Sequence, residues 1–87
     1  MKFLYYDLGY IGSNRKVEVN IDKTANVILV DANNFSKYKR GHSFQYIGGN
    51  MQPGSCTLVT NMSAHWYVVV DLGGRSGEVH ASCRILD

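Results

Sequence analysis

The sequence predicts an all-β protein, a compact antiparallel β-sandwich or partly closed barrel of about seven to eight short strands. Two observations lead to this class. Apolar and polar residues alternate with a period of two over most of the chain, and no segment shows a convincing helical period. Clusters of Gly, Asn, Asp and Ser separate the alternating runs at regular spacing. The chain has 87 residues, which suffices for one core, so we expect residues 1–87 to form a single domain.

The alternation places the individual strands. In Lys16–Ile21 the odd positions are apolar and the even positions are polar, as in a strand with one buried face. His65–Leu72 is the longest run and is apolar on both faces. Further strands are expected at Phe3–Tyr10, Val27–Val30, Ser43–Ile47, Cys56–Thr60 and Glu78–Leu86. Gly73–Gly77 is predicted to be a hairpin loop, and Phe35–Arg40 a single helical turn or a loop.

The inward positions of these strands define the expected core. A buried Trp66 would need an acceptor for its indole N–H. The other face of the longest strand carries Tyr67 and Val69, which must be covered by the N-terminal strand or by a second subunit. A homodimer through Tyr67 and Val69 is therefore one expectation. The predicted core consists of Val17, Val19, Leu29, Trp66, Val68, Val70, Val79 and Ile85.

Composition and charge narrow the classes of function. The net charge of +2 is too small to indicate nucleic-acid binding by itself. No apolar run approaches the ~18 residues of a membrane span, and Asp7 interrupts the apolar residues that a signal peptide would need. We therefore expect a cytoplasmic protein that does not contact a membrane. In that compartment Cys56 and Cys83 are expected to be reduced core residues.

Cofactor and metal motifs are incomplete. Gly73-Gly74-x-x-Gly77 follows a strand, but a phosphate-binding loop needs a helix after it, and here another strand pattern follows. Asp31-x-Asn33 resembles the start of a calcium loop, but Ser36 and His42 stand where that loop requires Gly and Glu. No Cys-x-x-Cys pair provides the spacing of structural zinc. We expect no cofactor and no metal.

One segment combines aromatic side chains with positively charged ones. Phe35–Tyr46 interleaves aromatic with basic residues, which suits a base or a sugar stacked on the rings. It could also be a solvated loop whose aromatic residues return to the core. The leading hypothesis is a non-enzymatic module that binds a small ligand or a protein partner, with Arg40→Ala or Tyr38→Ala weakening binding without unfolding. The candidate residues are Tyr38, Lys39, Arg40, His42, Tyr46 and Arg75.

Two other hypotheses remain open. An enzyme could build a small pocket from His65 and Asp71, with a histidine and a carboxylate within hydrogen-bonding distance and perturbed pKa values. The structural interpretation of Asp71 is a carboxylate that caps a turn, and the functional alternative is a polar anchor for a ligand at one end of the sheets. A purely structural protein could instead act by self-association.

Three blocks of sequence resemble a known family. They are Met1-Lys2-Phe3-Leu4-Tyr5-Tyr6-Asp7-Leu8-Gly9-Tyr10, the run Asn26-Val27-x-Leu29-x-Asp31-x-x-Asn34-Phe35-x-x-Tyr38, and His65-Trp66-Tyr67-Val68-Val69-Val70-Asp71-Leu72-Gly73-Gly74. Together they are similar to small bacterial proteins catalogued as a domain of unknown function. The resemblance implies a compact all-β sandwich with no established activity and no catalytic residues. Because some members are joined to signalling or effector domains such as TIR, it also implies a sensing or docking role.

Overall fold

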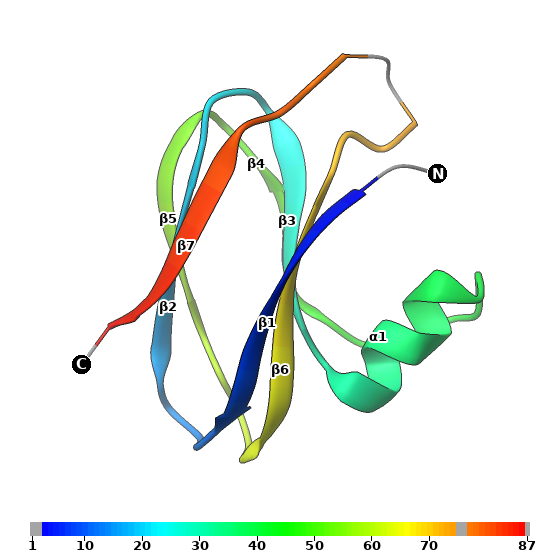
Figure 1. The fold of residues 1–87 in the computed structure, drawn as a ribbon, viewed down its shortest axis with the longest axis vertical. Helices are drawn as coiled ribbons and strands as arrows, with labels where there is room; N and C mark the ends of the chain where they lie inside the picture. The colour runs from blue at the N-terminus through cyan, green and yellow to red at the C-terminus, as the bar shows by residue number, and fades with distance from the viewer. Residues whose placement is uncertain (1–2, 75–76, 87) are drawn as a thin grey trace.

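The computed structural model describes residues 3–74 and 77–86, which form seven strands and one short helix (Figure 1). Most strands follow the alternating runs of the sequence, and β2 has the expected bounds, but the strand expected at Glu78–Leu86 begins only at Ala81. In chain order the elements are β1 (Phe3–Ile11), β2 (Lys16–Ile21), β3 (Ala25–Asp31), α1 (Ala32–Lys39), β4 (Ile47–Met51), β5 (Gly54–Val59), β6 (Ala64–Asp71) and β7 (Ala81–Leu86). The helix in this part of the chain is too short to cross a membrane.

Two antiparallel sheets face each other. One has the strand order β1-β6-β3-β4 and the other the order β5-β2-β7. The sandwich form of the prediction is therefore confirmed, and the sheets do not join into a closed barrel. The predicted hairpin at Gly73–Gly77 is wrong, because β6 and β7 belong to different sheets and the connection crosses between them (Figure 1).

The predicted core lies between the two sheets. Six of its eight members are buried, and Val79 and Ile85 are partly buried against them. The indole N–H of Trp66 donates to the carbonyl oxygen of Met62 at 3.1 Å, which provides the acceptor that a buried tryptophan requires. The apolar side chains at alternate positions thus form the dry layer of the sandwich.

The helix α1 covers the outer face of the four-stranded sheet. Phe35 is its buried residue, and the Phe35 ring stacks on Tyr67 with 4.2 Å between centroids. Val69 lies in the same cluster and is fully buried. The sequence predicted that the N-terminal strand or a second subunit would cover this face, but α1 covers most of it. The helix is also longer than the single turn expected at Phe35–Arg40. Lys37 and Lys39 in its last turn interact favourably with the helix dipole.

The strand predicted at Ser43–Ile47 is wrong, because β4 begins only at Ile47. The alternation before it has another cause. The Phe44 ring turns onto Tyr38 of α1, with 5.3 Å between centroids, so it packs on the helix rather than in a sheet. Gly48 lies in β4 at φ +112°, where a Cβ atom would stand 2.3 Å from the carbonyl oxygen of Val27.

Candidate functional site

The residues of the predicted binding segment lie around the C-terminal end of α1. Tyr38 is half-buried, and its hydroxyl donates to Oδ2 of Asp71 at 2.8 Å. Lys39 places its Nζ 4.6 Å from the centroid of the Phe35 ring, as in a cation–π contact. Arg40 is the C-cap residue of the helix and is exposed. The three residues are consecutive in sequence, and the contacts of Tyr38 and Lys39 hold the helix in place.

The remaining members of the prediction are scattered. His42 is exposed after the end of α1, and its backbone N–H donates to the carbonyl oxygen of Lys37. Tyr46 is 53% exposed and lines a small hollow on the other side of Phe44. Arg75 lies outside the described residues. Of the described candidate residues, Tyr46 lines one of two cavities considered below, and the basic candidates line neither of these two.

The structure does not bring His65 and Asp71 together. They lie near opposite ends of β6, six residues apart, which is about 20 Å along a strand. His65 instead meets Asp7 of β1, with Nε2 2.6 Å from Oδ1, at the exposed surface. Asp71 is buried and accepts hydrogen bonds from three groups, so it acts as a capping and joining carboxylate. Those donors are Asn26 Nδ2 at 3.0 Å, Tyr38 Oη at 2.8 Å and Gly73 N at 2.8 Å.

The surface proposed for a homodimer is only partly accessible. Tyr67 is half-buried between the rings of Phe35 and His65, and Val69 has no exposed area. A partner could therefore reach Tyr67 but could not contact Val69 unless α1 moved. The homodimer stays a prediction, with the edge of Tyr67 as the accessible part of its surface.

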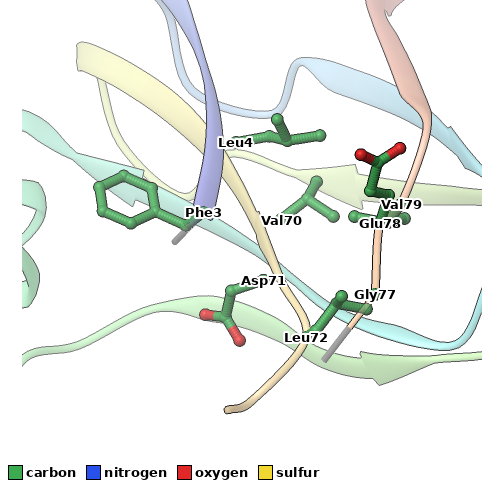
Figure 2. Close-up of a pocket in the computed structure, with 8 residues that line it drawn as sticks. All are labelled: Phe3, Leu4, Val70, Asp71, Leu72, Gly77, Glu78 and Val79. Atoms are coloured by element: carbon green, nitrogen blue, oxygen red, sulfur yellow. The ribbon is translucent and has the colours of Figure 1, made fainter. Parts of the chain in front are cut away.

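A larger cavity opens near the end of β6 where the chain leaves the first sheet. It has a volume of about 510 Å³ and lies between β1 and the end of β6 on one side and the segment 77–79 on the other. Figure 2 shows the side chains of Leu4, Val70 and Leu72 pointing toward that segment, whereas the Asp71 carboxylate points away. We call this space the edge cavity. Its lining residues are Phe3, Leu4, Val70, Asp71, Leu72, Gly77, Glu78 and Val79.

The strand order explains why a cavity forms there. β1 and β7 are edge strands of different sheets, and they are joined farther along by a hydrogen bond from the Tyr6 hydroxyl to the Ala81 carbonyl oxygen, 2.7 Å long. Burial, with a smaller effect from Cys83, raises the pKa of Tyr6 above the ordinary value of 10.0. Beyond this contact the chain leaves β6 and crosses to the second sheet, and Leu4, 39% exposed, faces the resulting gap.

Sequence reasoning missed the edge cavity. Val79 was expected in the core, and Leu72 at the end of the longest strand, but neither expectation indicated a hollow beside them. The glycines that follow Leu72 could have indicated this cavity, because glycine adopts backbone conformations that let the chain leave the sheet abruptly. The distance between two sheet edges, however, has no local signature in the sequence.

Comparison with known proteins agrees with the resemblance seen in the sequence. No curated protein and no solved structure matches the chain. One family model matches, and it covers residues 1–87, the whole of the sequence given. The chain thus belongs to the DUF1883 family, a domain of unknown function.

Proposed function

We propose that this domain is a non-enzymatic binding module that takes a small apolar molecule into the edge cavity. One observation carries the proposal: a space of about 510 Å³, whose lining includes four aliphatic side chains and a phenylalanine, lies open at the edge of the sandwich. Ligand sites in proteins are commonly ~300–1,000 Å³ in volume and mostly apolar. A molecule of that kind would bury the exposed face of Leu4 and gain roughly 25 cal/mol for each Å² removed from water.

The position of the cavity also suits a sensing role. Its walls come from the start of β1, the end of β6 and the segment before β7, which are distant in sequence. A ligand held between them would connect the edges of the two sheets where Tyr6 and Ala81 do not reach. Binding would therefore reduce the motion of one end of the sandwich, a change that a linked domain or partner could detect.

The experiment uses Nile red, an uncharged dye whose fluorescence rises when its rings enter an apolar site. The test variant Val79→Trp fills the edge cavity. Its matched control, Val59→Trp, places the same ring on the exposed face of β5, because Val59 is 43% exposed. We expect saturable fluorescence for the wild type and Val59→Trp, and its loss for Val79→Trp.

Stability must be measured in parallel, because a loosened core also binds this dye. If Val79→Trp proves unstable, Leu4→Arg serves instead, since Leu4 is partly exposed and tolerates a charge at the mouth of the cavity. Equal dye binding by the cavity variant and the control, with both melting as the wild type does, would refute the proposal. Failure of the wild type to bind the dye would refute it as well.

A further inference from the structure

A second, smaller hollow lies where β3 runs into α1, and it differs in chemistry from the edge cavity. It has a volume of about 210 Å³. Trp66, near the start of β6, is part of its wall, whereas the edge cavity adjoins the last residues of that strand. We call it the polar hollow. Its lining residues are Asp31, Asn34, Gln45, Tyr46, Ile47, Asn61, Met62 and Trp66.

We propose that the polar hollow binds one ring of a neutral, polyhydroxylated molecule, such as a monosaccharide. Four of its lining residues carry a carboxylate or a primary amide, which can accept from and, for the amides, donate to vicinal hydroxyl groups. The volume is below the ~300 Å³ at which sites for drug-sized ligands begin, so a single ring is a fitting size.

Internal hydrogen bonds fix the orientation of one of these amides, that of Asn34. Asn34 donates from Nδ2 to Oδ1 of Asp31 at 2.6 Å and accepts from the backbone N–H of Gln45 at 2.9 Å. Both bonds require the same orientation of the Asn34 amide, which settles its oxygen and nitrogen positions. A binding site held in this way loses little conformational entropy when a ligand arrives.

The carboxylate of Asp31 does not cap α1, although Asp31 stands at the N-cap position of that helix. It is the N-cap residue of α1, where an aspartate commonly accepts a hydrogen bond from a backbone N–H of the first turn. Its side chain makes no such cap bond. Among the described residues the carboxylate takes one hydrogen bond, from Asn34, of the roughly four that it can accept. The remaining capacity can receive hydroxyl groups of a ligand.

Aromatic side chains form part of the wall of the hollow. The indole of Trp66 is held by its bond to the Met62 carbonyl oxygen at 3.1 Å. The Tyr46 ring is 53% exposed and is braced by Phe44, with 5.4 Å between the centroids. The negative face of such a ring attracts the slightly positive C–H groups on one side of a sugar ring. An aromatic side chain beside the oriented amide of Asn34 is thus complementary to both the C–H groups and the hydroxyl groups of a sugar.

The charge of the hollow selects against anions. Its described lining contains one carboxylate, Asp31, and no lysine, arginine or histidine. A phosphorylated or carboxylated sugar would place a negative charge near Asp31 without a compensating cation, which like-charge repulsion disfavours. The ligand class is therefore a neutral sugar or polyol, and a sugar phosphate serves as the negative comparator.

The test is an NMR titration with glucose, galactose and mannose, each in large molar excess. The protein has a single tryptophan, so the indole N–H signal of Trp66 reports on the hollow without ambiguity. We expect a saturable shift of that signal with at least one sugar and a dissociation constant of about 1 mM. Glucose 6-phosphate should bind at least tenfold more weakly than the neutral sugar.

Matched pairs of variants separate the site from general surface effects. Tyr46→Ala and Asn61→Ala should weaken sugar binding about tenfold or more, by the loss of a stacking ring and of a hydrogen-bonding amide. Tyr10→Ala, at a tyrosine 73% exposed on β1, and Asn33→Ala, at an exposed residue of α1, should leave it unchanged. All four side chains are exposed, so the fold should tolerate each change.

Three results would overturn the proposal: no saturable shift of the Trp66 indole signal with any sugar, equal weakening by the control variants, or binding of the sugar phosphate as tight as that of the sugar. Val79→Trp, which fills the edge cavity, should bind sugar as the wild type does. Failure of the dye experiment would thus leave this second site standing, and failure of the sugar titration would leave the edge cavity standing.

Discussion

Tyr38 and Asp71 are joined by a hydrogen bond of 2.8 Å between the tyrosine hydroxyl and Oδ2 of the carboxylate. The bond connects α1 to the last residue of β6. Oδ1 of the same carboxylate accepts from Asn26 Nδ2 and from the backbone N–H of Gly73. Asp71 therefore holds the helix, the neighbouring strand β3 and the glycine turn together at one end of the sheet.

Removing this hydroxyl should cost stability. In Tyr38→Phe the partly desolvated Oδ2 atom loses a donor, and hydrogen bonds to charged groups contribute ~1.5–3 kcal/mol. We expect the free energy of unfolding in urea to fall by about that amount. The control Tyr46→Phe, at an exposed ring, should change it by less than ~0.5 kcal/mol. If the two variants unfold alike, Tyr38 is free for ligand binding as the sequence first indicated.

Because of the same hydrogen bond, the free energy of unfolding should depend on pH in the alkaline range. Burial, followed by the hydrogen bond to Asp71, raises the pKa of Tyr38 above the ordinary value of 10.0. Its contribution is complete below pH 10 and decreases at higher pH, because the unfolded chain releases this proton first. We expect the free energy of unfolding to fall more steeply above pH 10 in the wild type than in Tyr38→Phe. Parallel curves would contradict the assignment.

Gly48 should be among the least replaceable glycines. Gly48→Ala would place a Cβ atom 2.3 Å from the carbonyl oxygen of Val27, which β4 cannot relieve without moving away from β3. Gly41→Ala is the control, because Gly41 also has a positive φ, +74°, but open space around it. We expect a loss of ~1–2 kcal/mol for the control and more than ~3 kcal/mol for Gly48→Ala by thermal unfolding. Equal losses would show that backbone conformation alone matters.

Two aspartates should titrate below their ordinary pKa of 3.8. The backbone N–H of Gly9 and then the side chain of His65 lower the pKa of Asp7. The backbone N–H and then the ring of His80 lower the pKa of Asp22. What these carboxylates contribute to stability is present above pH ~4 and is lost as pH falls through their lowered pKa values.

Single histidine variants distinguish the two carboxylates. His65→Ala should raise the pKa of Asp7 part of the way and leave that of Asp22 unchanged, and His80→Ala should do the reverse. The backbone hydrogen bonds persist in both variants, so neither pKa should return fully to 3.8. Carboxyl ¹³C shifts recorded against pH measure this. A change at both aspartates in either variant would mean that the histidines act through a general loss of structure.

Cys56 and Cys83 should remain unpaired and unreactive in the folded protein. Both are aligned with Val19 of the central strand β2, one on each side. Their Cα atoms are therefore separated by two strand spacings, about 9.6 Å, beyond the ~7 Å limit for a disulfide. Burial raises the pKa of both thiols, which reduces the reactive thiolate. We expect 5,5′-dithiobis(2-nitrobenzoate) to react slowly until urea unfolds the chain, and fast reaction without urea would contradict this.

Local patterns determined the strands and the core. Val17 and Val19 alternate with polar residues in a strand with the predicted bounds, because a period of two is a property of each strand by itself. The errors arose where another element intervened. Phe44 alternates like a strand residue but packs on α1, and Gly48 looks like a turn residue but allows two strands to approach closely.

The chain by itself therefore determined the all-β class, the burial of β6 on both faces and the members of the core. Only the tertiary structure decided which strands are neighbours, that α1 covers Val69, and that His65 meets Asp7 instead of Asp71. The physical reason lies in the range of the interactions. Alternation is set by the backbone of one strand, whereas the edge cavity and the polar hollow depend on how far apart separate elements come to rest, which no single segment encodes.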